Sequence, residues 1–189
     1  ATGWFRGSDG QWRTEISDDQ MQIIFDTPRL EAHVGNQTTL GEFIRHDDLF
    51  AAYPQLQGLR VRFINEPNQQ YTAIAHTAEE TGNDSEIIIN IGARYLDVPD
   101  IIRDRRLHSV MAHEIQHIVQ FIERFIHPGL LNREETRRYL RERNGQLLIP
   151  YHARPWEAEA IDTEERSRLS PEQRRMFPPA DIRNRVERG

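Results

Sequence analysis

Residues 110–125 read VMAHEIQHIVQFIERF, and they carry the pattern HExxH. In an α-helix, residues i and i+4 lie on one face a single turn apart, so His113 and His117 can point at the same metal ion. Glu114 follows the first histidine and can reach a water molecule at that ion. Two imidazole ligands, an open position for water and a carboxylate that accepts its proton are what a zinc hydrolase requires. The segment therefore predicts a metal-binding helix.

This helix is expected to run from near Asp104 to about Phe125 or Ile126, where Pro128 and Gly129 end it. Apolar residues occupy nearly every face of its second half, which predicts that it is largely buried. Buried polar side chains are costly when they lack partners. A metal ion with its water would satisfy all three polar side chains of the motif.

The composition indicates a polar, globular protein. The 189 residues are 37% hydrophobic and 29% charged, with a formal net charge of -6, and they suit one domain. No run is basic enough for a nucleic-acid surface, and no stretch is long enough to span a membrane. The first ten residues carry no export signal, as expected of a protein that is cytoplasmic, delivered into a target cell, or cut from a larger polypeptide.

Cysteine and lysine are both absent, so all 24 basic residues are arginine. The absence of cysteine excludes disulfides, thiolate zinc sites and cysteine nucleophiles. The absence of lysine excludes Schiff-base chemistry and a phosphate-binding P-loop lysine. A GC-rich genome is the simplest explanation for the missing lysine; function in a foreign cytoplasm, where lysine tagging is a hazard, is the alternative.

Short strand and helix patterns surround the motif and predict an α+β fold. A turn cluster at residues 7–10 lies between two aromatic arms and predicts a β-hairpin at residues 3–16. A capping-box pattern at Thr39 and Glu42 begins another helix. Other strands are expected at residues 21–25, 59–63, 71–76 and 86–91, and other helices at 39–53, 132–144, 157–162 and from 170.

The apolar, β-branched run at residues 86–91 is the strongest strand signal in the chain. If its edge is exposed beside the motif helix, it can pair with the extended backbone of a peptide substrate. Alternatively, it is a central strand of the sheet. Both arrangements are compatible with a small sheet in front of the motif helix.

A catalytic zinc ion usually takes three protein ligands. In one group of peptidases the third follows as HExxHxxGxxH, but here the corresponding positions hold Gln120 and Glu123. Without a helix break, Glu123 lies far around the helix from His117, so this type of site is rejected.

Glu157 and Glu159 are the candidates for the third ligand. They are two residues apart and diverge by about 200° on a helix, so only one can face the metal. The segment 157–160 has the ExxA form seen in several glutamate-ligand zinc peptidases, which favours Glu157, although the ligand chemistry allows either. Tyr151 and His152 precede this helix and are candidate donors to a tetrahedral oxyanion, with Tyr151 preferred as the catalytic residue.

Four segments, residues 1–13, 40–42, 49–54 and 113–120, resemble the large polyvalent proteins of phages and other mobile elements. The resemblance spans most of residues 1–162 and implies a zincin-like metallopeptidase domain. It implies that His113, His117 and a glutamate of the segment 157–160 bind zinc and that Glu114 is the catalytic base. It also implies that the domain is cut from, or related to, a multi-domain phage or secreted-effector polypeptide.

The sequence thus predicts an α+β, zincin-like fold in which a small twisted sheet packs on the HExxH helix and a following glutamate-ligand helix. Residues 1–170 are expected to form one domain, with a hairpin and strand element at 1–26, and residues 171–189 a short helix and an arginine-rich tail. The expected activity is zinc-dependent hydrolysis of peptide bonds in a protein or peptide substrate. The alternatives are an inactive, zinc-stabilised interaction module and a metal-free buried helix.

Overall fold

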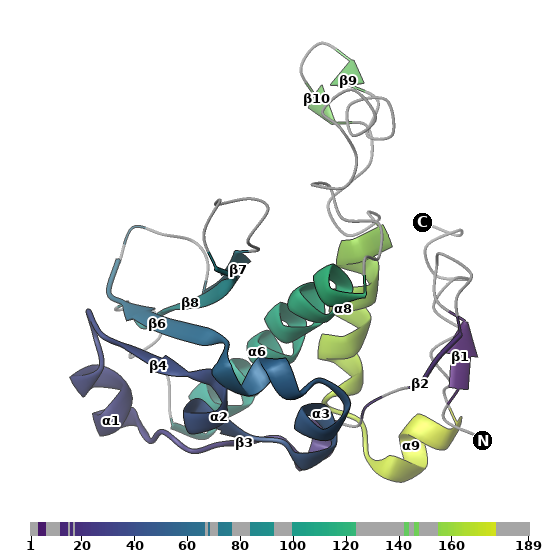
Figure 1. Ribbon diagram of the computed structural model, residues 1–189, viewed down its shortest axis with the longest axis horizontal. Coiled ribbons are helices and arrows are strands. Elements are labelled where there is room, and N and C mark those ends of the chain that lie inside the picture. Colours follow the sequence, from purple (N-terminus) through teal and green to yellow (C-terminus); the bar gives the residue numbers. More distant parts are fainter. Residues whose placement is uncertain are drawn as a thin grey trace.

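The computed structural model describes residues 4–6, 12–14, 16, 18–66, 68, 72–76, 84–92, 100–123, 142–143, 146–147 and 155–176. These residues form an α+β fold with small mixed sheets (Figure 1). The helices are η1 (Asp18–Gln20), α1 (Thr27–Ala32), α2 (Leu40–Phe43), α3 (Asp47–Ala52), η2 (Pro54–Gly58), α6 (Asp100–Ile122), α8 (Pro155–Arg166) and α9 (Pro171–Met176). The strands are β1 (Trp4–Arg6), β2 (Trp12–Thr14), β3 (Gln22–Ile23), β4 (Gln37–Thr39), β5 (Ile44–Arg45), β6 (Arg60–Ile64), β7 (Ala73–His76), β8 (Glu86–Asn90), β9 (Glu142–Arg143) and β10 (Gln146–Leu147).

The largest sheet has the strand order β4-β6-β8-β7. β8 runs parallel to β6 and antiparallel to β7, and β4 is antiparallel to β6. The strand predicted at residues 86–91 is therefore central and has no open edge. Its side chains are buried on both faces, which explains its continuous apolar sequence. The edge strand that packs beside α6 is β7.

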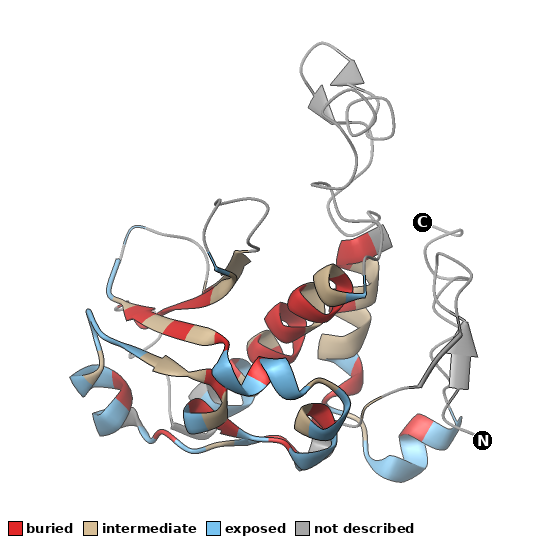
Figure 2. Ribbon diagram, viewed as in Figure 1, coloured by how far each residue is buried: buried red, intermediate tan, exposed pale blue. Residues whose placement is uncertain are grey.

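The long helix α6 lies between the sheet and α8 (Figure 1). Figure 2 shows that its buried residues form an almost continuous stretch, as the apolar sequence predicts. Leu107, Met111 and Ile118 of α6 are buried in one core with Phe43 and Phe63. Burial of this apolar face is what holds α6 in place, because each large apolar side chain contributes about 1.5–3 kcal/mol when it leaves water.

The N-terminal part of the chain contains two short antiparallel strand pairs, β1 with β2 and β3 with β5. The predicted N-terminal hairpin is observed as the antiparallel pair β1 and β2. The helix predicted at residues 39–53 is instead two short helices, α2 and α3, separated by β5. The reason is tertiary: Ile44 is fully buried and pairs with Ile23 of β3, while the His46 ring accepts a hydrogen bond from the Leu49 N–H and begins α3.

Three other predicted helices have different outcomes. α6 begins four residues earlier than expected and ends at Ile122, before the predicted end at Phe125 or Ile126. The helix predicted at residues 132–144 lies mostly outside the described residues, and its last part is the strand β9, paired with β10. The short helix predicted from residue 170 is α9. No helix within the described ranges has both the length and the apolar character that a membrane span needs.

Candidate metal centre

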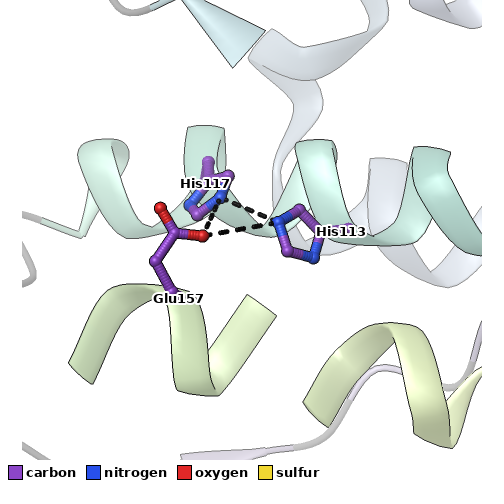
Figure 3. A group of neighbouring side chains, drawn as sticks. All are labelled: His113, His117 and Glu157. Carbon is purple, nitrogen blue, oxygen red and sulfur yellow. Dashed lines mark hydrogen bonds and ion pairs between the residues drawn. The ribbon is translucent and has the colours of Figure 1, made fainter. Parts of the chain in front are cut away.

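His113, His117 and Glu157 form a compact group between α6 and α8 (Figure 3). The Nε2 atoms of the two histidines are 3.1 Å apart. The Glu157 Oε2 atom lies 3.6 Å from Nε2 of His113 and 3.4 Å from Nε2 of His117. The two histidines lie on one face of α6, and Glu157 reaches them from the first turn of α8.

These separations suit a bound cation. Two ligand atoms on a tetrahedral zinc ion, each at its usual bond length, are separated by about 3.3 Å. The three observed distances lie within a few tenths of an ångström of that value. Two imidazole nitrogens and a carboxylate oxygen are also ligands that zinc accepts. Within the described part of the chain, this is the group of His, Asp and Glu side chains whose geometry can hold a metal ion.

The structure separates the two candidate glutamates. Glu157 is 7% exposed and faces both histidines. The carboxylate of Glu159 instead accepts a hydrogen bond of 2.9 Å from the Gln120 side chain. This difference follows from the angle between residues two apart on one helix, which turns their side chains to different sides of α8.

Glu114 lies about 100° around α6 from His113 and faces β7. It is 8% exposed, and its Oε2 atom accepts a hydrogen bond of 2.6 Å from the backbone N–H of Ala75. Burial raises the pKa of Glu114, although the nearby charges of His117 and His113 and the Ala75 hydrogen bond oppose this rise. A carboxyl group with a raised pKa is a stronger proton acceptor than an exposed carboxylate.

The two histidines differ in their outer contacts. The Nδ1 atom of His117 is 3.1 Å from Oε1 of Gln120. The Nδ1 atom of His113 is buried without a hydrogen bond to a described residue, and the Glu164 Oε2 atom lies 3.6 Å away. Burial lowers the pKa of His117, but the adjacent carboxylates of Glu157 and Glu114 outweigh it, so the pKa lies above its ordinary value.

The predicted donors Tyr151 and His152 lie outside the described residues. Three contacts of the site were not predicted: those made by Gln120, Glu164 and the Ala75 N–H. The spacing of Gln120, three residues after His117, was a usable signal because i and i+3 share a helix face. The Ala75 contact has no side-chain signal, since a backbone N–H exists at every residue other than proline.

A family model described as large polyvalent protein associated domain 23 matches residues 1–24. No curated protein and no solved structure matches the chain. The family match links the chain to large polyvalent proteins and supports the expectation that it is part of a larger polypeptide. The match covers β1, β2, η1 and β3 and does not reach α6 or α8, so it does not extend to His113, His117 or Glu157.

Proposed function

We propose that this chain is a zincin-like, zinc-dependent peptidase domain of a large polyvalent protein from a phage or another mobile element. The observation that carries the proposal is the group formed by His113, His117 and Glu157, with the buried carboxylate of Glu114 on the adjacent residue of the same helix. The N-terminal family match supports the polyvalent-protein context. The catalytic activity rests on the chemistry of the site.

Zinc held by the three side chains would polarise the scissile carbonyl and lower the pKa of water. Glu114 accepts a proton from the attacking water as its oxygen bonds to the carbonyl carbon. The carbon–nitrogen bond then breaks, and Glu114 returns the proton to the leaving amine. The products are a carboxylic acid and an amine, and Glu114 is a carboxylate again at the end of the cycle.

β7 offers a surface for the backbone of an extended substrate. The Asn90 N–H donates to the Thr72 carbonyl, and in an antiparallel pair such bonds recur at every second residue. The backbone groups of Ala73 and Ala75 therefore point away from β8, and the Ala75 N–H does so toward Glu114. A peptide that pairs with this side of β7 is placed beside the proposed base, with little dependence on its side chains.

The test is Glu114→Gln, which keeps the size of the side chain and removes its basicity. Zinc content by elemental mass spectrometry is expected to stay near that of the wild type, while the rate of peptide-library cleavage falls by roughly 100- to 10,000-fold. Wild-type and variant proteins are compared at equal zinc content. Cleavage by the Glu114→Gln variant at the wild-type rate would show that the proposed role of Glu114 is wrong. A wild type that takes up no zinc would show that the proposed metal site is wrong.

One observation favours a second function, that of a non-catalytic, zinc-stabilised interaction module. Glu114 is bonded to the backbone of the sheet and thus also connects α6 to β7. In that case zinc raises the thermal unfolding temperature of the wild type, but no peptide in the library is cleaved. In that case, the only expected effect of Glu114→Gln is a lower thermal unfolding temperature.

A further inference from the structure

Gln120 lies on α6 one turn after His117 and is 2% exposed. Its carboxamide has contacts with both helices of the metal centre. The Oε1 atom is 3.1 Å from Nδ1 of His117. The Nε2 atom donates to the Trp156 carbonyl and to the Glu159 carboxylate, each at 2.9 Å. A buried carboxamide needs partners for both its NH₂ group and its oxygen, and these three contacts supply them.

These contacts fix which atoms carry protons. The carbonyl of Trp156 and the carboxylate of Glu159 are acceptors, so the NH₂ group of Gln120 must face them. Its oxygen then faces His117 and can only accept, which requires a proton on Nδ1 of His117. In the neutral ring, Nε2 of His117 is left with its lone pair directed toward His113 and Glu157.

We propose that Gln120 is a positioning residue for the metal centre, acting through His117 and through the first turn of α8. It selects the His117 tautomer that can bind a metal through Nε2, and it ties the α8 turn that carries Glu157 to α6. The negative charge of Glu159 polarises the amide and strengthens the hydrogen bond to His117. Glu159 thereby supports the site without binding the metal. This inference rests on the proposed metal site.

Other side chains at position 120 cannot do all of this. Leucine has a similar size but leaves His117 Nδ1, the Trp156 carbonyl and the Glu159 carboxylate without their partner. Glutamate can accept from His117, but it cannot donate to the Trp156 carbonyl, and it places a second carboxylate against Glu159. Outer partners of metal-binding histidines typically change metal affinity by roughly 10- to 100-fold when removed.

The experiment is a zinc titration of the whole chain against a competing chelator. Gln120→Leu is expected to weaken zinc binding by roughly 10- to 100-fold. Gln116→Leu is the matched control, since it makes the same change one turn earlier at a side chain for which no hydrogen bond to a described residue is found. The control is expected to bind zinc like the wild type. Circular dichroism of the metal-free proteins checks that each variant folds.

Two charge variants test whether the hydrogen bonds of Gln120, and not only its packing, affect zinc binding. Gln120→Glu is expected to bind zinc weakly. Combining it with Glu159→Gln is expected to recover part of the affinity, because an amide then faces a carboxylate again while the Trp156 carbonyl still lacks its donor. Nitrogen NMR of the His117 ring adds a direct readout. The Nδ1–H form is expected in the wild type and is expected to lose its dominance in Gln120→Leu.

The outcomes separate the two proposals. If the wild type binds no zinc, the metal centre is wrong, and this inference falls with it. If the wild type binds zinc and Gln120→Leu binds equally well, the metal centre stands and the role of Gln120 is wrong. If Gln120→Leu does not fold, the charge pair decides: a double variant that binds zinc no better than Gln120→Glu alone overturns the inference.

Discussion

The HExxH segment of α6 packs against two elements, α8 and β7, and these contact different residues of the segment. On the α8 side, Glu157 faces His113 and His117. On the β7 side, the Ala75 N–H bonds Glu114. Because consecutive residues on a helix point about 100° apart, the proposed ligand His113 and the proposed base Glu114 face different neighbours. The proposed metal binding and proton transfer are therefore expected to depend on separate packing contacts, so that either can be broken without removing the other.

The largest expected effect comes from breaking the α8 side. Glu157→Ala removes a ligand atom and leaves two imidazoles to hold the ion, so zinc content measured by elemental mass spectrometry is expected to fall from about one per chain to near zero. Glu165→Ala is the control because Glu165 is exposed on the same helix. Glu159→Ala is expected to weaken binding but not abolish it. Zinc that persists in Glu157→Ala and is lost in Glu159→Ala would reverse the assignment of the third ligand.

A smaller effect is expected from breaking the β7 side. Ala75→Pro removes the N–H that bonds Glu114, and an outward-facing edge position tolerates proline because β8 does not use that N–H. Losing a hydrogen bond to a charged group is expected to lower kcat by roughly 10- to 100-fold. Zinc content is expected to be unchanged.

Ala73→Pro is the matched control for this strand, since the Ala73 N–H faces the same side of β7 and the hydrogen bond to Glu114 comes from Ala75. If both proline variants lose activity equally, the effect comes from the strand or from substrate pairing and not from the base. If Ala75→Pro also loses zinc, the contacts of α6 with β7 and with α8 depend on each other, and the expectation that they are separable is wrong.

Sequence patterns predicted the residues on the α8 side of the HExxH segment better than the contact on its β7 side. The i, i+4 spacing places His113 and His117 on one face without knowledge of the rest of the fold. Helix geometry predicted that only one of Glu157 and Glu159 can face the metal, and the ExxA form favoured Glu157. The packing of α8 on α6 is what sets the two apart. The Ala75 contact was beyond prediction because its position depends on how β7 packs against α6.

The same physical reason explains the errors outside the centre. A capping box at Thr39 predicts where a helix begins, and the Glu42 carboxylate does accept from the Thr39 N–H at 3.3 Å. It does not predict the break at Ile44, where pairing with β3 overrides the local helical pattern. In the sequence, Gln120 stands out only because it occupies the position of the glycine in the HExxHxxGxxH pattern. Its hydrogen bonds became evident once α8 supplied the Trp156 carbonyl and Glu159.

The smallest expected effect is at the far end of α8, where Glu164 faces His113. The 3.6 Å separation is too long for a hydrogen bond, and the Glu164 side chain is 26% exposed, so solvent weakens the interaction. Glu164 also pairs with Arg168 at 2.6 Å, and Arg168 in turn donates to Ser109 of α6. Its carboxylate is thus shared between a histidine and an arginine.

Glu164→Gln is therefore expected to weaken zinc binding by about tenfold or less, the lower end of the range for outer partners of metal ligands. The chelator competition used for Gln120→Leu measures it, with Glu172→Gln on the exposed face of α9 as the control. A loss as large as that of Gln120→Leu would mean that Glu164 moves into hydrogen-bond distance of His113 when metal is present. Both proposed ligand histidines would then have a hydrogen-bond partner on Nδ1, and His117 would no longer differ from His113 in this respect.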